Sequence, residues 1–420
     1  MKQDTRHFAH ASYGLLGLPL AMAALPVYVQ IPAYYTTQLG APLAATGLLL
    51  FFARLIDTVQ DPWLGRLIDR YPQHLKAWLI CAGCILAGAF FGLWLPPRLA
   101  ADSSLLAWLG LMLIIAYTGH SMLNIAYLAW GARLGETQMQ LRASAWREGL
   151  GLLGVISASL MPFFILQGAA GQIRGSLLAY TGGFALILLL ALLMLWNFAP
   201  RWQSQAEEHS IAWRVAFANP GFTGLLPIYF LNSLAAAIPA TLALFFIADR
   251  IVAEKYGGLF LALYFVAAAI GLPAWVRLAR QYGSQRAWQA GMLLAMSGFI
   301  GAVFLEAGDI WPYAMVCLIC GLALGSDLAL PPVMLAAAIP QDASAASYYG
   351  VWSLLGKLAL ACAGLALPLL AALGYQQGGK ETIGLSIVYA AVPCLLKLCA
   401  YLLLRRYRIN GVKINGVRLD

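Results

Sequence analysis

Long apolar blocks follow one another along the chain and are separated by short polar segments. Each block holds roughly the 20 apolar residues that a helix needs to cross the hydrocarbon core of a bilayer. The pattern therefore predicts an all-α integral membrane protein with about twelve transmembrane helices. We expect these spans near residues 12–37, 43–68, 77–97, 104–131, 146–166, 176–198, 223–248, 257–279, 286–306, 311–338, 346–373 and 383–404.

The longest polar stretch, from Asn197 to Asn219, follows the sixth expected span and divides the spans six and six. It predicts an N-terminal six-helix bundle at 1–199, a cytoplasmic linker at 200–222, and a C-terminal six-helix bundle with a cytoplasmic tail at 223–420. Apolar residues four apart within 211–217 predict a short interfacial helix in this linker. Two halves that move against each other are a common transporter plan.

The first expected span carries Pro19, Pro26 and Pro32, each of which removes a backbone hydrogen bond. We therefore expect this helix to be bent or broken. Irregular backbone is tolerated in a membrane only where protein or a water-filled cavity satisfies it, which favours a helix that lines a central path. A kink that serves packing alone is the alternative.

The composition agrees with this class, because 62% of the residues are hydrophobic and only 10% are charged. Soluble domains carry about 25% charged residues. Placing both termini in the cytoplasm puts about eighteen basic residues at cytoplasmic ends and about five on the other side, as the positive-inside rule requires. The net charge of +9 is thus explained by topology and does not indicate nucleic-acid binding. We expect a monomer in a bacterial-type inner membrane.

The cysteines and histidines of the chain do not form a catalytic or metal-binding pattern. The pairs Cys81/Cys84 and Cys317/Cys320 have a metal-like spacing but lie in apolar helices without nearby histidines, which favours packing. The five histidines are mostly terminal or in loops. We therefore expect neither an enzyme nor a bound cofactor or metal, other than a coupling ion.

Two acids, Asp57 and Asp61, lie in the middle of the second apolar block. A spacing of four places both carboxylates on one helix face, about 6 Å apart, where two like charges cannot both stay ionised unaided. A metal cation, a shared proton or the basic neighbour Arg54 could neutralise them. An ionisable residue inside a membrane is by default a functional-site hypothesis.

Polar and charged residues in four other spans add to this pair. His120, Ser121 and Asn124 give one face of the fourth span a polar character, although interhelical hydrogen bonding alone would explain them. Lys357 lies in mid-span and needs a buried acid, a substrate anion or a cavity. Asp327 is a candidate partner for Lys357, in a structural or a functional ion pair, and the sequence leaves open whether the two residues pair. Lys397 is nearer a cytoplasmic end and is expected to snorkel.

Charged residues also gather at the cytoplasmic ends of the spans. Asp69 and Arg70 end the second span, and we interpret them as a charge latch between helices, with a solvated helix end as the alternative. Arg142 and the pair Arg147–Glu148 frame the start of the fifth span, where Arg147 either reaches into the bundle or anchors the membrane surface.

The residues of several spans together match a known family. The matching segments are Ser12-Tyr-Gly, Ala53-Arg-Leu-Ile-Asp-Thr-Val-Gln-Asp-Pro-Trp-Leu-Gly with Asp69-Arg70, Ala126-Tyr-Leu-Ala-Trp-Gly-Ala, Arg142 with Arg147-Glu148, Gly325-Ser-Asp-Leu-Ala-Leu-Pro-Pro, and Lys357. With them the chain resembles the glycoside-pentoside-hexuronide:cation symporters of the major facilitator superfamily. The likeness runs through most of the chain, and the motif of the second span is the most specific part.

The resemblance implies cation-coupled transport of an organic solute. It places Asp57 and Asp61 at the cation site, where we add Gln60 and Ser121. It also matches Arg54 and Lys357 to the family's buried basic positions and Arg147 to a basic residue at the sugar site, and we assign the other polar residues described above together with these. Those expected at the substrate are His120, Asn124, Trp130, Arg147 and Lys357, and those expected in a gating charge network are Arg54, Asp69, Arg70, Arg142, Glu148 and Asp327.

Departures from the family pattern bear on the substrate. Two acids that grip sugar hydroxyls in melibiose-type members correspond here to Ala21 and Asn124, and the family's asparagine and threonine correspond to Gln60 and Ser121. Losing both acids removes the strongest hydroxyl acceptors. A sugar or glycoside thus stays one hypothesis, and a lysophospholipid or other amphiphile is the alternative. The residues leave the choice between Na⁺ and H⁺ open.

Overall fold

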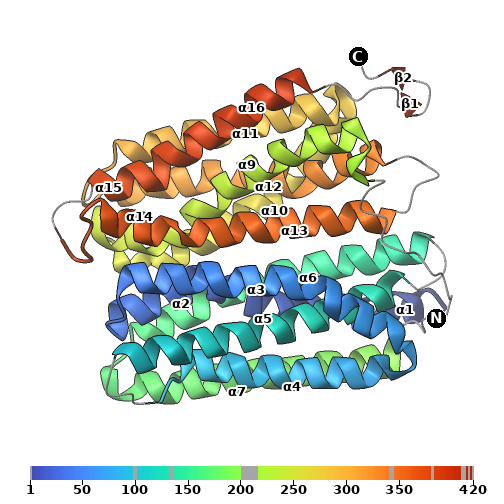
Figure 1. Ribbon diagram of the computed structural model, residues 1–420, viewed down its shortest axis with the longest axis horizontal. Coiled ribbons are helices and arrows are strands. Elements are labelled where there is room, and N and C mark those ends of the chain that lie inside the picture. Colours follow the sequence, from blue (N-terminus) through green and yellow to red (C-terminus); the bar gives the residue numbers. More distant parts are fainter. Residues whose placement is uncertain are drawn as a thin grey trace. The chain divides into compact units, whose positions relative to one another are not determined.

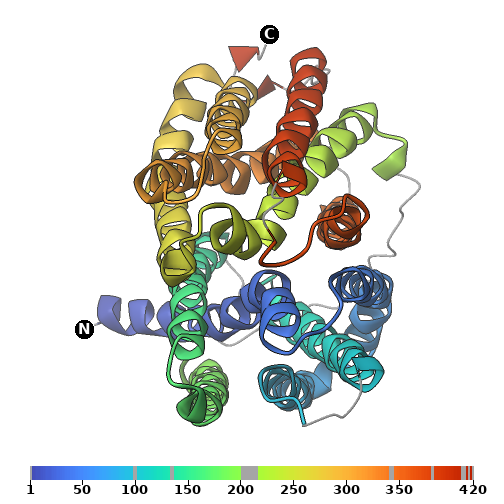
Figure 2. The same ribbon diagram turned by 90° about the vertical axis from the view of Figure 1, so that its left-hand side faces the viewer.

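The computed structural model describes residues 2–97, 102–132, 137–199, 216–339, 345–379, 383–407, 413–414 and 417–418. The chain divides into two compact units, 1–207 and 208–420, and each is considered by itself (Figures 1 and 2). Most of the expected linker, including the larger part of the expected interfacial helix at 211–217, lies outside the described residues.

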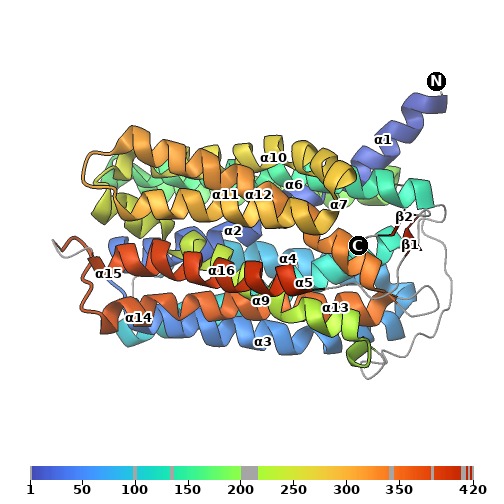
Figure 3. The ribbon, with the colours of Figure 1, turned by 90° about the horizontal axis from the view of Figure 1, so that it is seen from above.

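The first unit consists of helices. It contains α1 (Lys2–Gly14), α2 (Gly17–Ala33), the π-helix η1 (Tyr34–Gln38), α3 (Leu43–Arg70), the short 3₁₀ helix η2 (Pro72–His74), α4 (Leu75–Trp94), α5 (Asp102–Ala132), α6 (Thr137–Leu166) and α7 (Ala170–Phe198). The expected first span is broken between α1 and α2, and Figure 3 shows α1 at an angle to α2.

The second unit is built in the same way and ends in a short hairpin. It contains α9 (Pro220–Phe245), the π-helix η3 (Phe246–Arg250), η4 (Glu254–Tyr256), α10 (Gly257–Tyr282), α11 (Ser284–Val303), α12 (Ile310–Ala338), α13 (Ala345–Gly364), α14 (Ala366–Ala372), α15 (Ile383–Ser386), the π-helix η5 (Ile387–Ala391) and α16 (Val392–Arg406). In the tail, strands β1 (Lys413–Ile414) and β2 (Val417–Arg418) pair antiparallel.

The all-α membrane architecture expected from the apolar blocks is confirmed. Within the described residues, eleven helical segments are long and apolar enough to cross a membrane. The ninth expected span, 286–306, corresponds to α11, which is a helix of 20 residues but is not one of these eleven. Its first turn is polar, with Ser284, Gln285 and Arg286, and Gln289 follows one turn later.

The two units pack their helices in the same pairwise order. In the first unit α2 packs on α6, α4 on α5, α3 on α5, and α4 on α7. The second unit repeats these pairs as α9 on α13, α11 on α12, α10 on α12, and α11 on α16. The chain therefore contains an internal structural repeat of six helices, an arrangement found in many transporter folds.

A hydrogen bond from Gln30 of α2 to a carbonyl group next to Pro162 joins α2 to α6. Pro162 has no N–H to donate to the carbonyl of Ala158, one turn earlier in α6. The buried Gln30 side chain of α2 supplies the missing donor, with its Nε2 at 2.7 Å from Ala158 O and 3.3 Å from Ser159 O. The same two helices approach closely at Gly154, where a Cβ would lie 2.2 Å from the Leu18 carbonyl oxygen.

Helix ends in the second unit are tied by side chains. Asn219 caps α9, because its Oδ1 accepts from the backbone of Gly221 at 2.9 Å, and its Nδ2 donates to Ala338 O at 2.8 Å at the end of α12. Tyr407 follows α16 and donates its hydroxyl to Gly221 O at 2.7 Å. Burial raises the pKa of Tyr407 to about 12, which keeps this hydroxyl a donor.

The internal repeat extends to single backbone positions at the ends of α2 and α9. After η1, Ala41 N donates to Tyr35 O at 2.8 Å, and after η3, Ala253 N donates to Ile247 O at 3.0 Å. The residue before each donor has a positive φ, 76° at Gly40 and 55° at Val252. A β-branched residue is strained in this left-handed region, whereas glycine is not.

We expect glycine at position 252 and valine at position 40 to have opposite effects on stability. Val252→Gly removes the strain at a side chain that is 67% exposed, and should stabilise the second unit by about 0.5–1 kcal/mol after the entropy cost of glycine. Gly40→Val should destabilise the first unit by about 1–2 kcal/mol. Thermal unfolding of the purified variants in detergent measures both. A lower midpoint for Val252→Gly would show that the valine is unstrained.

Candidate functional site

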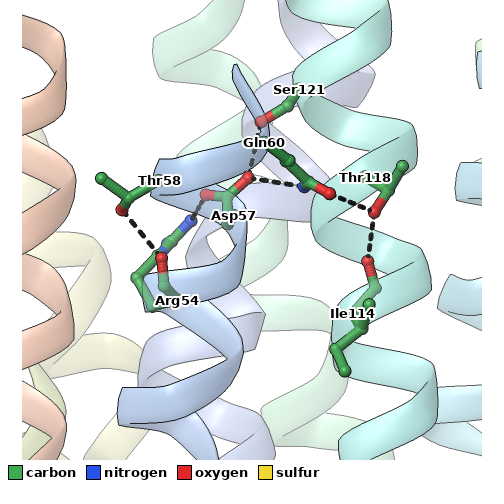
Figure 4. Close-up of polar contacts among 7 residues, drawn as sticks. All are labelled: Arg54, Asp57, Thr58, Gln60, Ile114, Thr118 and Ser121. Carbon is green, nitrogen blue, oxygen red and sulfur yellow. Dashed lines mark hydrogen bonds and ion pairs between the residues drawn. The ribbon is translucent and has the colours of Figure 1, made fainter. Parts of the chain in front are cut away.

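The carboxylate of Asp57 lies in α3 and is only 1% exposed. Three side chains donate to it, as Figure 4 shows. Arg54 Nη1 is 3.1 Å from Oδ2, whereas Ser121 Oγ at 2.7 Å and Gln60 Nε2 at 3.3 Å share Oδ1. Ser121 comes from α5, so the packing of α3 on α5 assembles the site. A buried charge needs such partners, because burial without them is costly.

The orientation of Gln60 is fixed by Thr118, a residue that the sequence motifs do not single out. Thr118 Oγ1 donates to Gln60 Oε1 at 2.9 Å and also lies 2.8 Å from the carbonyl of Ile114 (Figure 4). Since Oε1 accepts here, the amide presents its N–H₂ group to Asp57. Thr118 lies three residues before Ser121, on the same side of α5, and this hydroxyl spacing is the signal that could have identified it.

Arg54 provides the positive charge beside Asp57. Its guanidinium carbon lies 4.2 Å from the centre of the Tyr117 ring on α5, a cation–π arrangement, and its side chain is 12% exposed. Thr58 Oγ1 donates to the backbone oxygen of Arg54 at 2.8 Å. Of the three ways of neutralising Asp57 that the sequence allows, the structure shows the basic neighbour.

Asp61 follows Asp57 by one turn of α3 and is half-buried. Pro62 comes directly after it and is accommodated within the helix. The two acids, Gln60, Thr118 and Ser121 bring carboxylate, amide and hydroxyl oxygens to neighbouring turns of two packed helices. Oxygen ligands of this kind are those that hard cations prefer.

The residues expected at the substrate are distributed over both units. In the first unit His120 and Asn124 are half-buried one turn apart on α5, and Trp130 is buried with 4% exposure. Arg147 of α6 pairs with its neighbour Glu148, whose side chain is 71% exposed, with Nη2 at 2.6 Å from Oε1. Lys357 is half-buried on α13 of the second unit.

The structure answers one open question about charges in the second unit and contradicts one expectation. Asp327 of α12 pairs with Lys397 of α16, with Nζ at 2.8 Å from Oδ2, and not with Lys357. Lys397 does not snorkel to the surface, because its side chain is only 2% exposed and also donates to Asn232 Oδ1 of α9 at 2.8 Å. Trp288 Nε1 of α11 donates to the other oxygen of Asp327 at 2.9 Å. Helices α9, α11, α12 and α16 thus meet at one buried ion pair.

The structure describes only some of the residues of the expected charge latch and charge network. The side chains of Asp69 and Arg142 lie outside the described part of the structure. Arg70 lies in the last turn of α3 and is exposed, with its guanidinium carbon 5.7 Å from the centre of the Tyr71 ring. The latch therefore stays a prediction.

Comparison with known proteins assigns the chain to a family. The model of the family described as "MFS/sugar transport protein" matches residues 11–411. The chain belongs to this family. The resemblance drawn from the span motifs is thereby confirmed, and the molecule is a multi-pass membrane transporter of small-molecule solutes rather than an enzyme.

Individual relatives are more distant. The transporter is 25% identical to the inner membrane symporter YicJ of Escherichia coli (strain K12) over 176 residues, which cover 39% of this chain and 35% of that protein. The chain therefore matches only about a third of the length of this curated relative.

Solved structures show the same fold at low identity. The nucleoside transporter NupG is 12% identical with a TM-score of 0.71, covering 96% of this chain and 100% of that chain. The D-xylose-proton symporter is 14% identical with a TM-score of 0.66, covering 94% and 96%. A bacterial homologue of the human lysosomal transporter Spinster, inward-facing and unoccupied, is 15% identical with a TM-score of 0.67, covering 96% and 98%.

The buried pair Asp327–Lys397 allows a test of whether each charge is needed mainly to compensate the other. Asp327→Asn or Lys397→Met alone leaves one buried charge uncompensated and should destabilise the transporter by about 3–5 kcal/mol. The double variant Asp327→Asn, Lys397→Met removes both charges and should lie closer to the wild type than either single variant. Unfolding of the three purified variants in detergent measures this coupling. Additive losses in the double variant would show that the two charges do not compensate each other.

Proposed function

We propose that the transporter is a symporter that couples the entry of a cation, Na⁺ or H⁺, to the movement of an organic solute by alternating access. The observation that supports this most is the buried Asp57 carboxylate, held between α3 and α5 by Arg54, Gln60 and Ser121. An intramembrane acid is by default a functional-site hypothesis, and the amide and hydroxyl groups beside Asp57 are of the kind that a hard cation accepts as ligands. The cation would bind between Asp57 and Asp61, with the hydroxyl oxygens of Thr118 and Ser121 as ligands, and with the Gln60 amide oxygen once that amide turns from Thr118 toward the carboxylates.

Arg54 gives this site two alternative states. With no cation bound, the guanidinium neutralises Asp57 at 3.1 Å. A bound Na⁺ or proton takes over that task, because one carboxylate does not need two positive partners in a site with 1% exposure. Arg54 is then free to rely on the Tyr117 ring, 4.2 Å away. The exchange of partners on Asp57 is the local event that we assign to cation coupling.

Helix α5 connects the proposed cation site to the proposed substrate site. Ser121 donates to Asp57, whereas His120 and Asn124, its neighbours on α5, are half-buried and are expected to contact the solute. A helix that carries ligands for both partners makes their binding mutually dependent. The cation should therefore raise solute affinity by the same factor as the solute raises cation affinity.

The proposed substrate is a sugar or glycoside, bound by polar residues of the first unit that include Asn124, His120 and Arg147. Asn124 can donate as well as accept hydrogen bonds, which suits hydroxyl groups although it is weaker than a carboxylate. The family description and the relatives are consistent with such solutes.

A second candidate substrate is an amphiphile. A hollow of about 620 Å³ lies on the exposed face of α3 and is lined by apolar side chains together with Gln60, the cation-site residue. Its wall includes the exposed aromatic and aliphatic residues Trp63, Val59 and Ile56. An apolar group held there would contact the side chain that fixes Asp57, so an acyl chain or an aromatic aglycone could also be coupled to the cation.

We also propose the setting of the transporter. The distribution of basic residues supports cytoplasmic termini, and the relative YicJ is described as an inner membrane protein. A monomer in a bacterial-type inner membrane is consistent with both.

A thermal-stability screen tests ligand and ion together. The purified transporter is heated with glycosides, sugar acids or lysolipids, each in Na⁺ or K⁺ buffer at two pH values. A bound ligand should stabilise the native state by about 2.7 kcal/mol at a hundredfold excess over Kd. We expect one solute class to raise the unfolding midpoint more in Na⁺ buffer than in K⁺ buffer, or more at one of the two pH values than at the other. Equal shifts in all ionic conditions would contradict coupling.

Uphill transport tests the role of the two acids. Asp57→Asn and Asp61→Asn should each abolish accumulation of the solute driven by an ion gradient, because the carboxylate charge is lost, while exchange of solute across the vesicle membrane continues. Asp309→Asn is a matched control, since that acid only accepts from the Glu306 N–H in the loop between α11 and α12, at 2.9 Å. Accumulation that survives both changes in α3 would refute the proposed cation site.

A further inference from the structure

A groove lies between α4 and α5 of the first unit, and the residues that line it are different from those described around Asp57. Its volume is about 540 Å³, within the range of small-ligand pockets. On α4 it is lined by the small residues Cys84, Gly88 and Gly92, which are four apart and share one face. A Cβ added at Gly88 would meet no atom within 4 Å, so this part of the groove is open space.

The opposite wall of the groove is formed by larger side chains of α5. Trp108, Met112 and Ile115 line it, and they follow one another at helical spacing. Trp108 Nε1 donates to Gly92 O at 2.9 Å, which holds the indole across the end of the groove. Met112 packs against Gly92, where a Cβ would lie 2.4 Å from its sulfur. The wall is therefore fixed by contacts between the two helices.

The length of the groove corresponds to one leaflet of a bilayer. It extends from Cys84 in the middle of α4 to Leu95, just past its end. Eleven residues of helix are about 16 Å long. The hydrocarbon core is about 30 Å thick, so the groove spans about half of it. Cys84 is exposed and Phe91 is 46% exposed, as expected of a surface that faces lipid.

A single cation stands at the polar end of the groove. Arg174 is the one charged residue among the described side chains that line it, and it is exposed in the second turn of α7. The positive end of the α7 dipole adds to its charge. A tryptophan near the end of a span, such as Trp108, is typical of the level of lipid headgroups. An apolar channel one leaflet long with a guanidinium at its mouth is complementary to a chain-bearing anion.

We propose that this groove binds one anionic phospholipid, with an acyl chain along α4 and α5 and the phosphate at Arg174. The lipid belongs to the leaflet at the end of α4 that bears Trp94. It covers the seam between α4 and α5, next to the tight crossing where a Cβ on Gly119 would lie 2.8 Å from the Leu86 nitrogen. Because α5 also carries Thr118 and Ser121, the bound lipid stabilises the helix pair behind the Asp57 site without contacting it.

Lipid retention by the full-length transporter tests this site. The protein is purified in mild detergent, incubated with phosphatidylglycerol or phosphatidylcholine of identical acyl chains, and analysed by native mass spectrometry and thermal unfolding. We expect one phosphatidylglycerol to be retained about fivefold better than phosphatidylcholine, the effect of one basic residue at an anionic headgroup. Arg174→Gln should remove this preference, and Gly88→Leu, which fills the open space, should remove the retained lipid itself.

A matched arginine variant distinguishes this groove from lipid binding elsewhere on the protein. Arg280→Gln changes another exposed arginine, in the last turn of α10, and should leave the preference unchanged. Each variant is first shown to unfold cooperatively without added lipid, and Gly88→Ile replaces Gly88→Leu if the latter does not. Wild-type preference in Arg174→Gln, wild-type retention with the groove filled, or equal stabilisation by inorganic phosphate would each overturn the proposal.

Discussion

The neutralisation of charge inside the apolar helices is the constraint on which this transporter depends. A carboxylate such as Asp57 cannot remain in a membrane helix without compensation. Arg54 lies three residues earlier on the same helix, and Ser121 and Gln60 occupy the other carboxylate oxygen. The contact between α3 and α5 is therefore both a packing interface and the means of keeping a charge in the bilayer.

The second unit solves the same problem without a candidate ligand. Lys397 and Asp327 neutralise each other. Asn232 also accepts a hydrogen bond from Lys397, and Trp288 donates one to the second carboxylate oxygen of Asp327. The pair Arg54–Asp57 lies within the first unit and the pair Asp327–Lys397 within the second. A motion of either unit as a whole therefore need not break its pair. The difference lies in Arg54, which contacts the Tyr117 ring as well as Asp57 and so has a second favourable partner.

The sequence predicts the class, the approximate spans and the acid on α3, because these depend on local patterns. The length of an apolar block indicates a membrane span, and a spacing of four residues indicates that two side chains share one face of a helix. Contacts between residues of different helices cannot be predicted in this way, because the residue pattern of an apolar span does not show which helix it packs against. For Lys397 the sequence shows only the distance to a helix end, whereas Asn232 and Asp327, at 165 and 70 residues' separation, determine its position. The role of Thr118 likewise depends on a contact with Gln60 of another helix, and only its spacing of three residues from Ser121 marks it in the sequence.

The left-handed residues Gly40 and Val252 bear on the history of the chain. Their surrounding hydrogen bonds match position by position, while the side chains at the turn do not. Such a match is what duplication of an ancestral six-helix unit leaves behind after the residues have diverged. Glycine adopts this left-handed conformation without strain, so the turn at Gly40 suits its residue better than the turn at Val252 does. The geometry of the helix end is therefore kept in both halves of the chain, although the residue type that makes it favourable is not.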